Sequence, residues 1–145
     1  MNHAGQDNYR FEYQDEPIPE DEQVLFDGLN NEVAQKKNVD PIKPIRIYIK
    51  DAQGMVLGGA SGVSFYGSLY IDMLWLKENM RHQGLGKKLL MEAERIGRER
   101  NCTFATLNTM DWEALRFYQK LGYAIEFVRE GYDKESKMYM LRKKL

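Results

Sequence analysis

The sequence is poor in the residues that make disulfides and metal sites. It contains one cysteine, Cys102, so an internal disulfide is excluded. Its two histidines, His3 and His82, cannot assemble a zinc site of ordinary spacing with that single cysteine. We therefore expect a fold that depends on neither a disulfide nor a metal ion.

Long hydrophobic segments are also missing. No apolar run approaches the roughly 18 to 20 residues that a membrane-spanning helix needs. The amino terminus lacks the basic segment followed by an apolar one that is typical of a secretory signal. We therefore expect a cytoplasmic protein with no membrane partner. The modest basic excess of the body carries no nucleic-acid recognition motif, so we expect no nucleic-acid partner either.

The length and the charge distribution describe one domain with an acidic arm. A chain of 145 residues with 43% hydrophobic content can form a single compact core, so we expect one domain over 1–145 with a loose segment at 1–7. Residues 1–40 hold ten acidic and three basic side chains, whereas residues 41–145 hold twelve and eighteen. The arm is either a solvated helix face or a surface that attracts cationic ligands, and both interpretations stay open.

Hydrophobic periodicity predicts the elements of the first half. Alternation over 9–13 predicts a short strand, and apolar residues at three-to-four spacing predict an amphipathic helix from Asp21 to Lys37. Three strands of a meander are expected over 45–49, 55–60 and 69–76. Because the last run is almost wholly apolar, we expect it to be a central strand covered on both faces.

The second half alternates helices and strands. The pattern predicts a helix from Leu85, a strand over 103–107, a helix capped by Asp111 and ended near Gly122, and strands over 123–128 and 137–141. This order predicts an α/β (α+β) domain with a single mixed sheet covered by helices. The final strands offer an edge at which a homodimer would pair.

A glycine-containing segment, Arg81-His82-Gln83-Gly84-Leu85-Gly86, lies between a predicted strand and a predicted helix. Glycine allows backbone to approach a ligand closely, and the first amides of a helix lack intrahelical partners. Diphosphate suits such a site, with Arg81, Lys87 and Lys88 adding positive charge. The alternative is that the two glycines only form a tight turn.

Other phosphate-binding motifs do not fit. A Walker loop requires glycine where Arg81 stands and serine or threonine where Lys88 stands. A dinucleotide fingerprint requires a third glycine where Leu89 stands. Both nucleotide interpretations are therefore rejected.

Taken with its neighbours, the segment resembles the GNAT superfamily of N-acetyltransferases. The resemblance runs from about Pro44 to Leu145, and it rests on the apolar strand before the loop, on Arg81-x-x-Gly84-x-Gly86, and on the segment 117–123. It implies a splayed sheet that binds acetyl-coenzyme A (acetyl-CoA) as co-substrate. The coenzyme-binding residues that it implies are Leu74, Trp75 and Leu76 on the strand, and Arg81, His82, Gln83, Gly84, Leu85, Gly86, Lys87 and Lys88 in and after the loop. The family often has asparagine where this chain has Asp111, and a carboxylate cannot donate an amide hydrogen bond there.

The same resemblance points to two catalytic side chains and a backbone donor. Tyr118 matches the tyrosine that often acts as general acid in the family, and a phenol with a pKa near 10 stays protonated at neutral pH. Asp72 is the candidate general base, and strand alternation is expected to place it on one face with Tyr70, Leu74 and Leu76. A carboxylate in so apolar a run is costly unless it is paired or used. A structural ion pair is the alternative for Asp72. A backbone N–H near Leu76 is expected to stabilise the oxyanion.

The acceptor is expected to be a small-molecule primary amine. Phe65, Tyr66 and Tyr70 are candidates for the wall of its site, although aromatic residues of a sheet also serve as core. Two other functions stay open on sequence alone. One is a non-catalytic acyl-CoA-binding or regulatory module, and the other is an acetyltransferase for protein lysines or amino termini.

Overall fold

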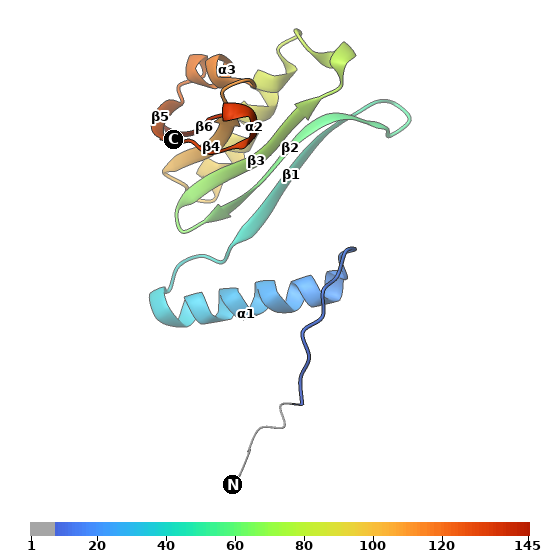
Figure 1. Cartoon of the computed structure of the whole chain (residues 1–145), viewed down its shortest axis with the longest axis vertical. Helices are drawn as coiled ribbons and strands as arrows, with labels where there is room; N and C mark the ends of the chain where they lie inside the picture. Colours follow the sequence, from blue (N-terminus) through green and yellow to red (C-terminus); the bar gives the residue numbers. More distant parts are fainter. Residues whose placement is uncertain (1–7) are drawn as a thin grey trace. The chain divides into compact units, whose positions relative to one another are not determined.

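The computed structural model describes residues 8–145, which fall into two units, residues 8–38 and Val39–Leu145 (Figure 1). The expected loose segment over 1–7 lies outside the described residues. The expectation of one domain over the whole chain stays a prediction.

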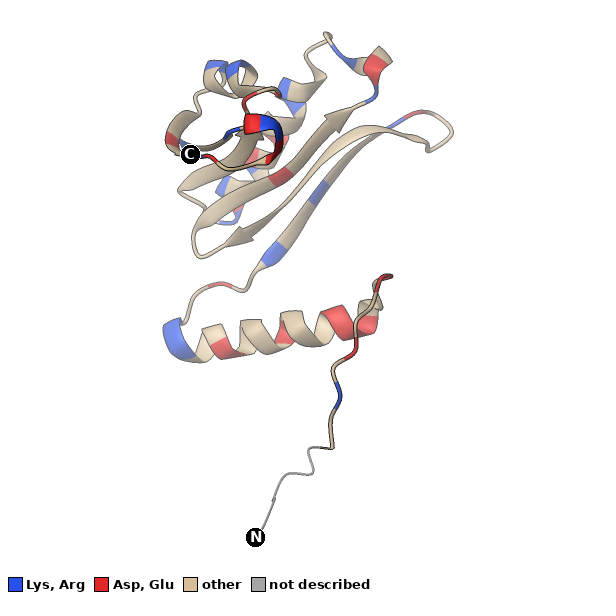
Figure 2. Cartoon of the chain, viewed as in Figure 1, with Lys and Arg blue, Asp and Glu red and all other residues tan. Residues whose placement is uncertain are grey.

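The amino-terminal unit contains one helix, α1 (Pro19–Lys37), and acidic side chains predominate along it (Figure 2). Pro19 starts the helix, and Asn38 ends it in a left-handed conformation with φ of 52°. The helix was expected, but none of its residues is buried.

The strand expected over 9–13 is wrong, because these residues form no regular structure. Alternating polarity makes a strand only when a second strand supplies hydrogen-bond partners. The side chains of this segment make local contacts instead, and Tyr9 packs edge to face against Phe11. Gln14 donates to Glu12 at 2.8 Å and to Asp21 at 2.7 Å.

The second unit is built on a six-stranded sheet in the order β1-β2-β3-β4-β6-β5. Its strands β1, β2 and β3 form the expected meander, and β3 and β4 are parallel, so the sheet is mixed. This confirms the predicted fold class. The elements are β1 (Lys43–Lys50), β2 (Val56–Phe65), β3 (Ser68–Leu76), α2 (Leu85–Glu99), β4 (Phe104–Met110), α3 (Leu115–Lys120), β5 (Ala124–Arg129) and β6 (Met138–Lys144), with short 3-10 turns η1 (Glu78–Met80) and η2 (Asp133–Glu135).

Strands β3 and β4 separate halfway along their length. They pair from Ser68 with Phe104 to Ile71 with Leu107, and no further pairing between them occurs in the described chain. Beyond that point β3 remains paired with β2, and β4 remains paired with β6. The sheet is therefore splayed open between its two central strands.

A β-bulge at Asp72 coincides with this separation. Ser61 of β2 lies opposite Met73, and Gly62 lies opposite Ile71, so Asp72 has no residue opposite it. An extra residue changes which side chains share a face. Leu74 packs against the same buried cluster as Ile71, whereas Met73 is exposed.

The bulge corrects two expectations about β3. The strand is central, but it is not covered on both faces, because Asp72, Met73 and Trp75 are exposed. Asp72 was also expected to share a face with Leu74 and Leu76. Strict alternation from Tyr70 gives that result, and a bulge breaks strict alternation.

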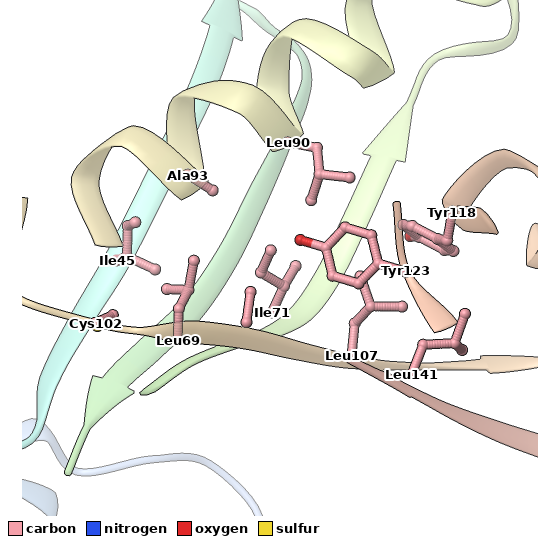
Figure 3. Close-up of a cluster of buried hydrophobic side chains, with 11 residues drawn as sticks. Ile45, Leu69, Ile71, Leu90, Ala93, Cys102, Leu107, Tyr118, Tyr123 and Leu141 are labelled. Carbon is pink, nitrogen blue, oxygen red and sulfur yellow. The ribbon is translucent and has the colours of Figure 1, made fainter. Parts of the chain in front are cut away.

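One hydrophobic core lies between the sheet and helices α2 and α3 (Figure 3). Leu90 and Ala93 of α2 point toward Leu69 and Ile71 of β3. The buried Cys102 belongs to the same cluster.

The expected cap at Asp111 is wrong, because α3 begins at Leu115 after Ala114. Residues 111–114 instead form turns. The Glu113 N–H donates to the Met110 carbonyl at 3.0 Å, and the Met110 N–H donates to Glu113 Oε1 at 2.9 Å. This reciprocal pair closes the connection, which leaves no capping role for Asp111.

Candidate active site

A cavity of about 1050 Å³ occupies the gap between β3 and β4. It is bounded by the far half of β3, by the loop that leads into α2, by the end of β4, and by α3 with the turns before it. Its lining residues are Asp72, Met73, Leu74, Trp75, Leu76, Arg81, His82, Gly84, Leu85, Gly86, Lys87, Asn108, Thr109, Trp112, Glu113, Ala114, Phe117 and Tyr118. The volume is at the upper end of the range for small-molecule sites, roughly 300 to 1000 Å³.

The loop before α2 presents backbone amides to this cavity. His82 has a φ of 62° and Gly84 a φ of 79°, so two residues of the loop are left-handed. Turns of this kind make concave clusters of N–H groups that bind anions. The first intrahelical bond runs from the Lys88 N–H to the Gly84 carbonyl, which leaves the amides of residues 85–87 without an intrahelical partner.

The polar side chains of the loop and of the first turn of α2 divide into two groups. Arg81, His82 and Lys87 line the cavity, and Arg81 Nε donates to the Leu76 carbonyl at 3.1 Å, which ties the loop to the end of β3. Gln83 and Lys88 do not line it, and Gln83 Nε2 donates to the Asn79 carbonyl at 3.1 Å instead. The amides and cations that remain fit a diphosphate.

Gly86 is required by the packing of the loop against α3. A Cβ at this position would come within 3.2 Å of Phe117 Cζ and 3.9 Å of Leu74 Cδ2. Glycine therefore allows the first turn of α2 to approach the helix that carries Tyr118. Gly84 differs, because a Cβ there would meet open space and only its positive φ favours glycine.

Tyr118 lies on α3 with its side chain buried and its residue surface 9% exposed. Its ring packs edge to face against Phe117 and Tyr123, with centroids 5.1 and 6.1 Å apart. Burial, with a smaller contribution from the charge of Glu113, raises the pKa of its phenol. Among the described residues its hydroxyl has no hydrogen-bond partner, and it is not sealed from solvent. The hydroxyl is therefore available to a ligand.

Asp72 lies at the position where β3 and β4 separate. It accepts a hydrogen bond from Ser61 Oγ at 2.5 Å, and it pairs with no basic side chain of residues 8–145. A structural ion pair, which the sequence left open, is therefore not formed. The exposed carboxylate borders the cavity.

The three aromatic candidates for the acceptor wall lie apart from the cavity lining. Phe65 and Tyr66 stand at the β2–β3 turn, at the opposite end of β3 from the loop, and their rings pack edge to face. The Tyr70 hydroxyl accepts a hydrogen bond from Asn108 Nδ2 at 3.3 Å. Tyr70 thus does not line the cavity itself, but it contacts Asn108, which does.

Sequence reasoning missed the contribution of the β4–α3 connection. Trp112 and Glu113 line the cavity, with Asn108 and Thr109 of β4 beside them. The exposed indole of Trp112 is fixed by a 3.1 Å hydrogen bond from its Nε1 to Ser136 Oγ. A tryptophan in a turn-rich segment was the available signal, because aromatic side chains commonly line ligand sites.

One cavity thus brings together the splayed strands, the amide-lined loop and the tyrosine on α3. The sequence that forms it matches a known protein family. The model of the acetyltransferase (GNAT) family matches residues 6–123. The chain belongs to this family. The resemblance noted in the sequence is thereby confirmed.

Two curated acetyltransferases are similar in sequence to part of this GNAT chain. "Acetyltransferase Atu2258" of Agrobacterium fabrum is 38% identical over 81 residues, which are 56% of this chain and 59% of that protein. "Blasticidin-S acetyltransferase" of Streptomyces morookaense is 33% identical over 87 residues, 57% of this chain and 64% of that protein. The chain thus spans less than two thirds of the length of either relative it matches.

Solved structures match over most of the chain. One is a crystal structure from Agrobacterium tumefaciens that is described as an acetyltransferase. Its sequence is 28% identical to this chain, and the TM-score is 0.78 over 94% of this chain and 100% of that one. A GNAT acetyltransferase from Elizabethkingia anophelis with acetyl-CoA bound has a TM-score of 0.59 at 18% identity, over 92% and 95% of the chains. The second likeness shows the shared fold.

Residues 8–145 contain neither a helix suited to a membrane nor a cluster of metal-ligating side chains. None of the helices there has the length and apolar character to cross a membrane. No group of three or more histidine, cysteine, aspartate or glutamate side chains in that range is placed to hold a metal ion.

Proposed function

We propose that this GNAT protein transfers an acetyl group from acetyl-CoA to a primary amine of a small molecule, in a complex that contains both substrates. The observation that carries this proposal is the unpartnered Tyr118 hydroxyl, which borders the same cavity as the amide-lined loop. One cavity thus offers a diphosphate site and a proton donor.

The coenzyme would be held by backbone on two sides. Its diphosphate would accept hydrogen bonds from the amides of residues 85–87, with Arg81 and Lys87 supplying charge. Its pantetheine amides would pair with the free edge of β3 over Leu74–Leu76, as an added strand pairs with a sheet. The lack of β4 pairing along this edge supports that placement, because unpaired backbone groups need a partner.

Acetyl-CoA supplies the activated acyl group, and the chain supplies positioning and proton transfer. The amine nitrogen forms a bond to the acetyl carbonyl carbon, and the bond from that carbon to sulfur breaks. Tyr118 gives its phenolic proton to the departing thiolate, while Asp72 takes a proton from the amine, directly or through water. A backbone N–H near Leu76 would stabilise the oxyanion.

A small-molecule acceptor is favoured by the size of the cavity. Its volume of about 1050 Å³ is typical of sites that hold small molecules, roughly 300 to 1000 Å³. The relative named for blasticidin-S supports a small acceptor as well.

The test is release of free thiol from acetyl-CoA with a panel of amines, run beside calorimetry with acetyl-CoA alone. The proposal expects binding of acetyl-CoA and amine-dependent thiol release. Binding without release from any amine would instead identify a non-catalytic module. Release with peptides but not with small amines would identify a protein acetyltransferase.

A further inference from the structure

The cavity contains two chemically different groups of side chains. Arg81 from the loop before α2 and Lys87 from the first turn of α2 make one part of its surface cationic. Asp72 lies on β3 and Glu113 on the β4–α3 connection, and they make the other walls anionic. An anionic diphosphate and a cationic acceptor would therefore be drawn to different parts of one site.

Glu113 is held in place by backbone and yet keeps an oxygen for a ligand. Its Oε1 accepts the Met110 N–H at 2.9 Å, which fixes the carboxylate, while no described group bonds to Oε2. Its charge is near enough to Tyr118 to help raise the pKa of that phenol. Glu113 is thus within electrostatic reach of the proposed proton donor.

Trp112 precedes Glu113 in the chain and adds an aromatic surface to the lining of the same cavity. It is 70% exposed, but the hydrogen bond to Ser136 Oγ fixes its indole ring. Tryptophan is the best aromatic partner for cations, and a carboxylate beside a tryptophan face is a typical combination for binding an ammonium or guanidinium group.

A second observation points to a ligand at this place. Tyr118 lines the same cavity, is only 9% exposed as a residue, and its hydroxyl has no partner in the described chain. Because the hydroxyl is not sealed from solvent, a ligand that enters the cavity can bond to it. Such a ligand would share the cavity with Glu113.

We propose that the acceptor carries a second cationic group besides its reacting amine, and that Glu113 and Trp112 bind this second cation. The inference rests on the proposed function, because it concerns the acceptor of the same cavity. Binding the distant cation would position the amine near Tyr118 without using the atoms that react.

The test compares agmatine with butan-1-amine, since the two share a reacting amine and differ by a guanidinium group. Their dissociation constants are measured by calorimetry on the full chain at saturating coenzyme A. We expect agmatine to bind at least about tenfold more tightly, because a charged hydrogen bond contributes about 1.5 to 3 kcal/mol.

Variants test whether Glu113 and Trp112 cause the tighter binding of agmatine. Glu113→Gln keeps a carbonyl oxygen for the Met110 N–H and removes the charge, so the ratio of the two constants should fall toward one. Trp112→Leu should reduce the ratio, and Trp112→Phe should restore part of it. Glu130→Gln is the control, because Glu130 is exposed, pairs with Lys137 at 3.4 Å and lies outside the cavity lining.

A ratio near one in the wild-type protein, no binding of either amine, or a ratio unchanged in Glu113→Gln overturns this inference. Thiol release tests the proposed function separately. A clear agmatine preference without thiol release contradicts the proposed function and leaves the second-cation site standing.

Discussion

Gly86 lies directly against the ring of Phe117, so that a side chain of even one carbon would come within 3.2 Å of Phe117 Cζ. The contact joins the first turn of α2, which presents the free amides, to the helix that carries Tyr118. Gly86 is thus required for packing as well as for the approach of a ligand to the backbone. The position of the first turn of α2 and the position of α3 depend on each other through this contact.

Gly86→Val should weaken acetyl-CoA binding by at least about tenfold, because the added atoms displace either the amides or Phe117. Overpacking of this kind also costs about 1 to 3 kcal/mol of stability. Calorimetry and chemical denaturation measure the two effects. Gly28→Ala is the matched control, since a Cβ there meets nothing within 4 Å. Unchanged coenzyme affinity in Gly86→Val would contradict the role given to this contact.

Tyr118→Phe should lower kcat by about 10²- to 10⁴-fold with little change in the KM for acetyl-CoA. The hydroxyl has no partner in the described chain, so its removal should leave the free energy of unfolding nearly unchanged. Steady-state kinetics and denaturation together separate these readouts. Tyr48→Phe, at an exposed position on β1, is the control. A fully active Tyr118→Phe enzyme would remove this residue from the mechanism.

Stability should fall at alkaline pH because of Tyr123. Burial, followed by the charge and hydrogen bond of Glu94, raises the pKa of its phenol far above the usual value. Below about pH 10 the phenol is protonated in both the folded and the unfolded chain, so no penalty arises. Above it the unfolded chain loses the proton first, and folding is disfavoured by up to about 1.4 kcal/mol per pH unit.

Denaturation curves measured from about pH 8 to pH 11 test this slope. Tyr123→Phe lacks the titrating group, so its stability should fall less steeply with pH, whatever its stability at neutral pH. Tyr118→Phe should flatten the curve as well, since the pKa of Tyr118 is also raised. Parallel curves for all three proteins would show that neither phenol carries the effect.

Glu94→Gln should destabilise the fold. Its buried carboxylate accepts the Tyr123 hydroxyl at 2.9 Å and Lys143 Nζ at 2.8 Å, and so joins α2 to β6. Neutralising it leaves the half-buried ammonium of Lys143 without a charge partner, at a cost of about 1 to 3 kcal/mol. Glu92→Gln on the same helix removes an exposed pair with Arg95 and should change little. Equal effects in chemical denaturation would contradict this assignment.

Most strands and α2 could be predicted because their signals are local. Alternation in β1 and the helical stripe beginning at Leu85 reflect burial on one side, which the pattern records directly. The run over 9–13 has the same alternation but no partner strand, and no local pattern contains that information. Sequence alone therefore predicts a strand there that does not form.

The parts of the candidate site that depend on a local backbone motif could be predicted from the sequence. The parts that depend on contacts between distant segments could not. Gly84 and Gly86 marked the loop because φ and close approach require glycine. The bulge at Asp72 was not visible, because it depends on the register with β2. The exposed ring of Trp112 reaches the cavity through a turn that is held by Ser136, which is 24 positions away.

The most direct test of the whole account is thiol release from acetyl-CoA, monitored with the wild-type protein and Tyr118→Phe in the presence of agmatine. The account predicts amine-dependent release with the wild type, a product heavier by one acetyl group, and a loss of at least about a hundredfold in the variant. Release that is absent from the wild type across an amine panel, with acetyl-CoA bound, would contradict the account.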